Sequence, residues 1–253
     1  MANEDLMYHI QMKKGDVGRY VFLPGDPGRC EKIASYFDTP ELIAYNREYK
    51  TYTGTLMGEK VSVTSTGIGC PSTAIAVEEL IKIGADTFIR VGTSGGMQPH
   101  LKAGDLGIVT GAIRDEGTTL HYMPIEFPAV ADLDVVLALR EAAEKLGNDY
   151  ALGISQSKDS FFGQHEPERM PVDKRLLERW KAWVQGGTIC SEMEAATIFV
   201  LSSIYRKRAG GIMLIGWNQE GENPEVHVSD LDPLIRTAIK AVKILIEKDR
   251  AEI

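Results

Sequence analysis

Cysteine is scarce in this chain. The three cysteines among 253 residues, Cys30, Cys70 and Cys190, are far apart, and none belongs to a C-x-x-C pair or to a spacing typical of zinc ligands. We therefore expect neither a disulfide framework nor a structural zinc site, and such sparse thiols suit a reducing compartment. A globule of this length buries roughly 70–75% of its unfolded surface and does not need such cross-links.

Excess positive charge and long apolar runs are also lacking. The formal net charge is −8, which disfavours an extended contact with nucleic acid or an anionic membrane, because both require a basic face. No apolar run approaches the ~18 residues of a membrane span, and the segment MANEDLMYHI carries acids where a signal peptide carries lysine or arginine. We expect a cytoplasmic protein that binds neither nucleic acid nor membranes.

What the sequence does contain is a regular alternation of strand-like and helical segments. Strands are expected at 20–24, 41–46, 50–56, 61–66, 87–93, 105–114, 151–158 and 211–217. Helices are expected at 28–37, 72–84, 132–147, 171–184, 192–207 and about 230–248. This alternation predicts an α/β fold with a mixed central β-sheet flanked by helices. Since no linker or repeat divides the chain, we expect a single domain over residues 1–253.

A glycine-rich loop, PGDPGR, joins the first predicted strand to the first predicted helix. Gly25 allows backbone N–H groups to approach a ligand closely, and a helix N-terminus attracts anions. Arg29 has the wrong charge for that end of a helix, and an anion held between the two would remove the conflict. The alternative is a plain turn followed by a solvated arginine.

Arg90 interrupts the apolar strand TFIRVGT just before a glycine-rich loop. Ligands of open α/β sheets gather at the carboxyl ends of the strands, and an unpaired buried charge is strongly destabilising. The partner of Arg90 is therefore either a structural carboxylate or a bound anion, and the hydroxyl groups of Thr93 and Ser94 favour the anion. Arg47, in the polar segment YNREYKTY, shows no role of its own.

Two glutamates, Glu192 and Glu194, lie at the start of the apolar segment EMEAATIFVLSSIYRK. In one interpretation Ser191 caps a helix and the carboxylates lie near its positive end. In the other, Glu194 accepts hydrogen bonds from a sugar diol. Acids only two residues apart cannot flank one glycosidic bond from opposite sides, which argues against a glycosidase with paired carboxylates.

The segment KDSFFGQHEPER (158–169) combines amide, cationic and aromatic side chains in a predicted loop. Lys158, Gln164 and His165 supply polar groups, and Phe161 and Phe162 supply flat apolar surface. This combination suits a planar heterocycle, whereas the alternative is an ordinary polar loop with buried phenylalanines.

Together these motifs resemble the trimeric/hexameric nucleoside phosphorylase family, and within it the uridine phosphorylases. PGDPGR, YNREY, STGIGCPS, FIRVGTSGG, LHYMPIEFPAVAD and SEMEAA occur in one order over nearly the whole chain. The resemblance implies a pentosyltransferase that splits uridine with inorganic phosphate as co-substrate and needs no cofactor. It also implies a homo-oligomer, a hexamer formed by three dimers.

The resemblance further implies roles for individual residues. Phosphate would be held by Gly25, Arg29, Arg90 and Thr93, together with Arg47 from a neighbouring subunit. The ribose would be bound by Glu192, Met193 and Glu194, with His9 of a neighbour at the 5′-hydroxyl. The base would contact Phe161, Gln164, Lys158 and His165. A monovalent cation such as K⁺ would lie between subunits at Glu48, Ile68 and Ser72.

Two segments depart from the family's pattern. Many uridine phosphorylases have Gln-x-Arg where Gln164 is followed by His165 and Glu166, and their Asn-Arg after the late strand is replaced here by Gly-Trp-Asn (216–218). The arginine contacts to the base are therefore expected to be replaced by Lys158, His165 or Arg169.

A purine enzyme and a hydrolase are the alternatives within the same fold. The purine enzymes carry an aspartate in the late segment to protonate the purine ring, and none stands between Met213 and Gln219, which favours a pyrimidine. A hydrolytic nucleosidase would use water and would not need an arginine clamp.

Overall fold

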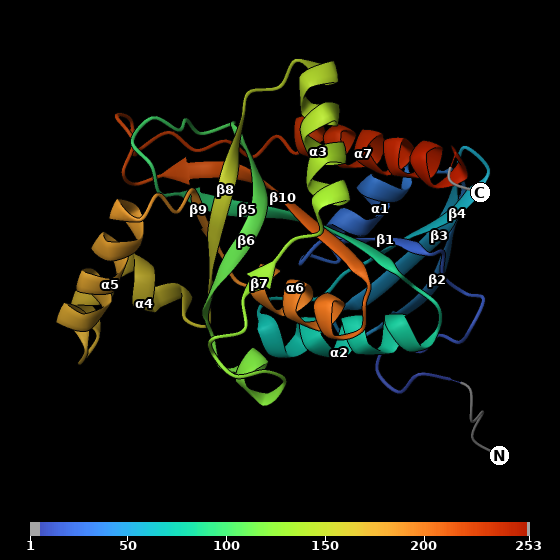
Figure 1. Ribbon diagram of the computed structural model, residues 1–253, viewed down its shortest axis with the longest axis horizontal. Coiled ribbons are helices and arrows are strands. Elements are labelled where there is room, and N and C mark those ends of the chain that lie inside the picture. The colour runs from blue at the N-terminus through green and yellow to red at the C-terminus, as the bar shows by residue number, and fades with distance from the viewer. Residues whose placement is uncertain (1–5, 252–253) are drawn as a thin grey trace.

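A mixed β-sheet of ten strands runs through the computed structural model, which describes residues 6–251 (Figure 1). The strand order is β10-β6-β8-β9-β5-β1-β4-β3-β2, with β7 beside β6 and an additional pairing between β10 and β5. That pairing closes β5, β10, β6, β8 and β9 into a small barrel, from which β1, β4, β3 and β2 extend as an open sheet.

The strands are β1 (Tyr20–Leu23), β2 (Asp38–Asn46), β3 (Tyr49–Leu56), β4 (Glu59–Thr64), β5 (Thr87–Gly96), β6 (Leu106–Asp115), β7 (Ala129–Val130), β8 (Tyr150–Lys158), β9 (Cys190–Glu192) and β10 (Arg208–Asn218). The helices are α1 (Gly28–Ala34), α2 (Cys70–Lys82), α3 (Leu133–Leu146), α4 (Phe161–His165), α5 (Asp173–Gln185), α6 (Ala195–Ile204) and α7 (Asp232–Ala251). Short 3₁₀ turns lie at Thr118–His121 and Pro167–Arg169. The predicted mixed α/β architecture is therefore confirmed.

The helices cover the sheet in two layers, each built on its own apolar cluster. Helices α1, α3 and α7 share one cluster with one face of the sheet, whereas α2 and α6 share the second cluster with the other face (Figure 1). Helix α6 is buried along almost its whole length, which explains why its sequence is apolar on every side.

Local sequence signals set several element boundaries. Asp132 caps α3 by accepting a hydrogen bond from Val135 N at 3.2 Å, and Gly147 ends the helix in the left-handed conformation at φ 68°. Met57 and Gly58 both have positive φ, 55° and 77°, and form the two-residue turn of the β3–β4 hairpin.

The structure corrects the helix predicted over residues 192–207. Helix α6 begins only at Ala195, because Cys190–Glu192 forms β9 between β5 and β8 and completes the barrel. Ser191 is a strand residue and not a helix cap. Glu192 does serve the helix end, since its Oε2 accepts hydrogen bonds from Glu194 N and Ala195 N, both at 2.8 Å.

The predicted loop at 158–169 is also more ordered than expected. Residues 161–165 form α4, which Ser160 caps by accepting a hydrogen bond from Gly163 N at 3.0 Å. Within residues 6–251, every helix is too short or too polar to span a bilayer. The same residues contain no cluster of three or more histidine, cysteine or acidic side chains that could bind a metal ion.

Candidate active site

A cavity of about 1470 Å³ lies at the carboxyl ends of β1, β5, β8, β9 and β10, where the barrel meets the open sheet. This is the place at which α/β sheets bind ligands. All but three of the predicted site residues line it: Gly25, Arg29, Glu48, Ile68, Ser72, Arg90, Thr93, Lys158, Phe161, His165, Glu192, Met193 and Glu194. Segments far apart in the sequence thus form one site.

Two arginines share one end of this cavity. Arg29, at the start of α1, donates from Nη2 to Thr93 Oγ1 at 3.2 Å. Burial and the nearby charge of Arg90 lower the pKa of Arg29. A Cβ atom at Gly25 would lie 3.1 Å from Gly67 O and 3.6 Å from Arg90 Nη1, so the loop approaches the arginine closely because glycine has no side chain. An anion between the guanidinium groups would relieve their repulsion.

Arg90 has carboxylate partners within the chain. It is only 4% exposed, and its Nη2 donates to Glu194 Oε2 while its Nη1 donates to Leu23 O at 3.3 Å. Its Nε lies 3.9 Å from Glu192 Oε2 and has no hydrogen-bond partner among the described residues. The structure thus supports the structural-carboxylate interpretation of Arg90 and leaves one donor of its guanidinium group unpaired.

The two glutamates have different surroundings. Glu194 Oε1 accepts a hydrogen bond from Gly69 N at 2.7 Å, and its Oε2 faces Arg90. Glu192 accepts hydrogen bonds from the Ser157 hydroxyl and from two backbone amides. Burial and the charge of Glu194 raise the pKa of Glu192. A carboxylate oxygen with one partner can accept a second, so Glu194 keeps the capacity to bind hydroxyl groups.

Aromatic rings line the other end of the cavity. The ring centroids of Phe161 and His165 are 4.2 Å apart, those of His165 and Trp217 4.8 Å, and those of Trp217 and His227 6.1 Å. Phe161 and Phe162 are 52% and 56% exposed, so flat apolar surface is available to a ligand. Burial and the charge of Lys158 lower the pKa of His165 to about 4, which keeps its imidazole neutral near pH 7.

The rings of Phe161, His165, Trp217 and His227 form what we call the aromatic wall of the cavity. The sequence did not predict two of these residues, Trp217 and His227. In the sequence Trp217 stands out only as part of a departure from the family's pattern. Its large ring at the end of a predicted strand is the feature that could have indicated a place in the site. Nothing local to His227 marks it, because it approaches the cavity through the tertiary arrangement of the segment between β10 and α7.

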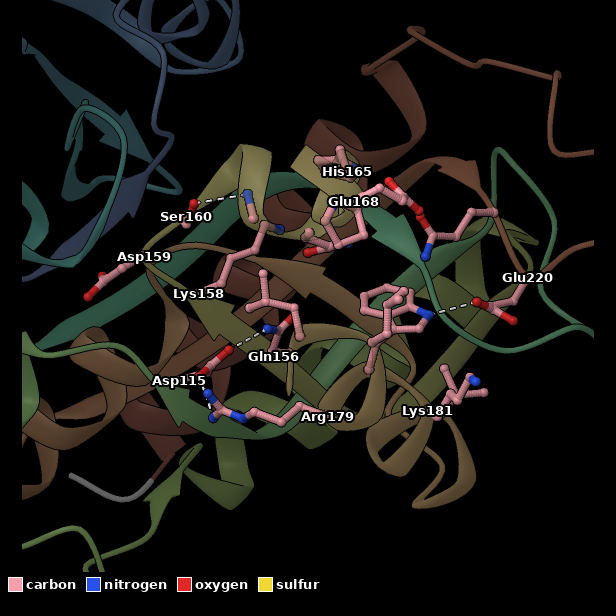
Figure 2. A pocket seen from close by; sticks show the side chains of 18 of the residues that line it. Asp115, Gln156, Lys158, Asp159, Ser160, His165, Glu168, Arg179, Lys181 and Glu220 are labelled. Carbon is pink, nitrogen blue, oxygen red and sulfur yellow. Dashed lines mark hydrogen bonds and ion pairs between the residues drawn. The ribbon is translucent and has the colours of Figure 1, made fainter. Parts of the chain in front are cut away.

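Lys158 ends β8 and lies deep in the site. It is 5% exposed, and its Nζ donates to Ser191 Oγ at 2.7 Å. Burial lowers the pKa of Lys158 to about 8, against the raising effect of Glu192 and Glu194. Lys158 and His165 also line a second cavity of about 650 Å³, shown in Figure 2, which lies beside the first.

Gln164 lines only this second cavity. Its Oε1 lies 2.6 Å from Ser191 Oγ, and its Nε2 is buried without a partner among the described residues. One end of the Gln164 amide is thus already in contact with the protein.

The other two predicted residues outside the main cavity, His9 and Arg47, lie close together elsewhere. His9 Nδ1 lies 2.7 Å from Glu79 Oε1, and His9 N donates to Glu79 Oε2 at 3.0 Å. Asn46 Nδ2 donates to His9 O at 2.7 Å. Arg47 follows directly, exposed and with a positive φ of 55°. Neither residue lines the cavity of its own chain.

The three residues expected at a cation lie at one margin of the cavity. Ser72 Oγ donates to Glu48 Oε1 at 2.6 Å, and this bond lowers the pKa of Glu48. Ile68 is adjacent in the lining and 78% exposed. A carboxylate, a hydroxyl and a main-chain carbonyl are oxygen donors of the kind that hard cations prefer, so the residues present fit such an ion.

Comparison with known proteins gives consistent matches over the whole chain. The family model described as "Phosphorylase superfamily" matches residues 19–248. The chain is 54% identical to a uridine phosphorylase of Treponema pallidum over 97% of this chain and 96% of that protein. It is 48% identical to a uridine phosphorylase of Thermococcus kodakarensis, over 98% and 90%. It is 38% identical to a guanosine phosphorylase of Halorubrum lacusprofundi, over 94% and 98%.

The buried charge of Lys158 leads to a prediction about stability and pH. Because the pKa of Lys158 falls from 10.5 to about 8 on folding, the unfolded chain binds more protons between these values, and wild-type stability should rise with pH across that window. Lys158→Met should be at least as stable as the wild type near pH 7, with an advantage that shrinks above pH 8. Urea denaturation across this range checks it.

Lys174→Met, at an exposed position of α5, is the matched control. It keeps Lys158, so its stability should rise with pH as that of the wild type does, and the difference between the two proteins should not change with pH. A Lys158→Met protein that is less stable at pH 7 and keeps the wild-type pH dependence would contradict the assignment.

Proposed function

The chain belongs to the phosphorylase superfamily, and we propose that it is a uridine phosphorylase, which converts uridine and inorganic phosphate to uracil and ribose 1-phosphate. The observation that carries the proposal is the division of one cavity into three parts. Arg29, Arg90 and Thr93 form one group, Glu194 contacts Arg90, and Phe161, His165 and Trp217 belong to the aromatic wall. These three groups suit phosphate, ribose and base.

The arginine end is suited to hold phosphate next to the sugar. Arg29 and the unpartnered Nε of buried Arg90 supply charged donors, and Thr93 supplies a hydroxyl. Glycine at position 25 lets the loop backbone come close to the same region. Phosphate held there attacks the anomeric carbon as the glycosidic bond lengthens toward an oxocarbenium ion. Its negative charge also stabilises that cation.

The ribose would lie against Glu194. Both oxygens of this carboxylate are fixed, one by Gly69 N and one by Arg90, so the group is rigid before the substrate arrives. A rigid carboxylate can accept hydrogen bonds from the two hydroxyl groups of the sugar diol. Met193 lines the same part of the cavity and supplies apolar contact.

The aromatic wall and Lys158 would receive the base. Phe161, His165 and Trp217 offer planar surfaces, and uracil leaves as an anion whose charge gathers on its carbonyl oxygens. Lys158 is the cation that lies in this part of the site, and it is charged below its pKa of about 8. Preorganised donors of this kind are worth roughly 2.7–4 kcal/mol each in the transition state.

A purine nucleoside is the alternative that the guanosine phosphorylase relative raises. Among the described residues of β10 and its end, no acid lines the main cavity. The next acid, Glu220, lines the second cavity and accepts a hydrogen bond from Trp180 Nε1 at 2.7 Å. Within this described segment no carboxyl group lines the main cavity, which supports a pyrimidine over a purine.

The proposal includes a shared active site in a homo-oligomer. Arg47 and His9 lie together and do not line the cavity of their own chain, as expected if each subunit supplies them to its neighbour. The assembly is a dimer at least, and a hexamer of three dimers by resemblance. A K⁺ ion at Glu48, Ile68 and Ser72 would be held between subunits, and no other cofactor is required. The buried free thiols suit the cytoplasm.

Phosphate dependence separates the phosphorylase from a nucleosidase. Uracil release from uridine should require phosphate, and Arg29→Ala should raise the KM for phosphate by at least about tenfold, because a charge-assisted hydrogen bond is worth ~1.5–3 kcal/mol. We prefer Arg29 to Arg90 for this test, since loss of Arg90 would leave buried Glu194 unpaired. Full-rate uracil release without phosphate would show that the enzyme is a hydrolase.

A shared site predicts complementation between defective subunits. Arg47→Ala and Arg29→Ala proteins should each be impaired, and mixing them after mild dissociation should restore activity, because some hybrid sites contain both arginines. Uracil release by the mixture, relative to each parent treated alone, is the measurement. A fully active monomer in analytical ultracentrifugation would contradict the shared site.

The base site predicts a strong preference for uridine over inosine and cytidine. A pocket whose polar groups must be satisfied often rejects a mismatched ligand by 10⁴-fold or more, taking the precedent of hydrogen-bonding pockets as an order of magnitude. Gln164→Ala and Lys158→Ala should each lower kcat/KM for uridine while the KM for phosphate changes little. Equal cleavage of inosine and uridine, or a Lys158→Ala enzyme that behaves like the wild type, would show that this assignment of the base site is wrong.

A further inference from the structure

A chain of hydrogen bonds runs from the second cavity to Gln164. Arg179 Nη2 lies 2.5 Å from Asp115 Oδ1, and Gln156 Nε2 donates to Asp115 Oδ2 at 2.8 Å; Figure 2 shows both contacts as dashed lines. Gln156 Oε1 then lies 2.8 Å from Ser191 Oγ, which also contacts Gln164 at 2.6 Å. The proposed function leaves Arg179, Asp115, Gln156 and Ser191 without a role.

The direction of each bond in this chain is determined by chemistry. The carboxylate of Asp115 can only accept hydrogen bonds, so Gln156 must present its Nε2 to Asp115 and its Oε1 to Ser191. Ser191 has a single hydroxyl proton, and this proton must go to Gln156 Oε1.

The remaining contacts of Ser191 must then be donors. Lys158 Nζ, when protonated, can only donate to Ser191 Oγ. The last lone pair of the hydroxyl faces Gln164, and no proton is left to give to a glutamine oxygen there. The two ends of a glutamine amide have nearly the same shape, so the hydrogen-bond network decides their orientation. Gln164 must therefore turn its Nε2 to Ser191 and its Oε1 away.

This orientation replaces the buried, unpaired donor of Gln164 by an acceptor and so changes what the site can bind. With Gln164 Oε1 at Ser191, the Nε2 group is buried without a partner. With Nε2 at Ser191, one N–H bonds the hydroxyl, while the other N–H and Oε1 point the same way. These two atoms pair with a carbonyl and an adjacent N–H, as found at the N3 edge of uracil. Cytosine offers an acceptor at N3 and leaves Oε1 unpaired.

We propose that Asp115, Gln156 and Ser191, which we call the Asp115 relay, orient the amide of Gln164 and thereby select a base with an N–H group at position 3. The relay residues are positioning residues, because they act through Gln164. The inference rests on the proposed function only in assigning Gln164 to the base.

The relay can be reversed by one substitution. In Asp115→Asn, Arg179 still requires an acceptor and holds the asparagine oxygen, so the asparagine amide faces Gln156. Gln156 then turns its Oε1 toward residue 115 and its Nε2 toward Ser191. The Ser191 proton moves to Gln164 Oε1, which leaves Nε2 facing the base. This arrangement favours cytosine, so kcat/KM for cytidine should rise while that for uridine falls.

The test measures kcat/KM for uridine and for cytidine with saturating phosphate near pH 6.5, where Lys158 is protonated given its pKa of about 8. Asp115→Asn should lower the uridine-to-cytidine ratio by at least about tenfold, as one misplaced hydrogen bond implies. Ser191→Ala removes the relay without reversing it and also removes a partner of Lys158. It should lower the ratio because uridine cleavage falls more than cytidine cleavage. The KM for phosphate should stay unchanged in both.

Glu220→Gln is the matched control. It exchanges a carboxylate for an amide in the same cavity, but its partner is Trp180 and not the relay. Its uridine-to-cytidine ratio should equal that of the wild type. A ratio that stays within twofold of wild type in Asp115→Asn and Ser191→Ala, even if both substrates are cleaved more slowly, would overturn the relay and leave these residues a structural role.

Binding of free bases separates this inference from the proposed function. Uracil and cytosine binding, followed by tryptophan fluorescence with Trp217 and Trp180 in the walls of the two cavities, needs no phosphorolysis. If the wild type binds uracil better than cytosine and Asp115→Asn reverses the order, the relay stands even if uridine is not cleaved. If uridine is cleaved and the order of base binding does not respond to Asp115→Asn or Ser191→Ala, the proposed function stands and the relay is wrong.

Discussion

The buried pair of Arg90 and Glu194 is the interaction on which the site depends. Arg90 comes from the middle of β5, Glu194 lies at the start of α6, and the same carboxylate holds the Gly67–Gly69 loop through Gly69 N. Breaking such a pair costs about 3–5 kcal/mol, because the remaining charge stays buried without a partner. The pair therefore fixes the relative positions of three segments, and both of its side chains line the main cavity.

Barrel closure explains why these groups meet at one place. Strand β9 is only three residues long, yet it joins β5 to β8 and sets Ser191 and Glu192 beside the carboxyl ends of both neighbours. Glu192 then caps α6 through Glu194 N and Ala195 N. The element that completes the barrel thus also aims the glutamates into the cavity. The predicted helix included Glu192, but pairing of this strand on both edges outweighs local propensity there.

The polar groups around Ser191 are ordered by the number of hydrogen bonds that each can donate and accept, and not by charge alone. Ser191 has one proton and two lone pairs, and its three side-chain contacts with Lys158, Gln156 and Gln164 use all of them. A buried network in which every group has one permitted role holds its members in a single arrangement.

The sequence by itself determined the α/β class, most element boundaries and which charged residues, Arg29, Arg90, Glu192 and Glu194, were candidates for one site. Periodicity, capping residues such as Asp132 and an arginine inside an apolar strand are local signals of burial and charge. Only the tertiary structure decided that Ser191 lies in a strand, that Trp217 and His227 complete the aromatic wall, and that His9 and Arg47 do not line their own cavity. These facts depend on which distant segments pack together, and a hydrogen-bond network acquires its direction only when all its members are in place.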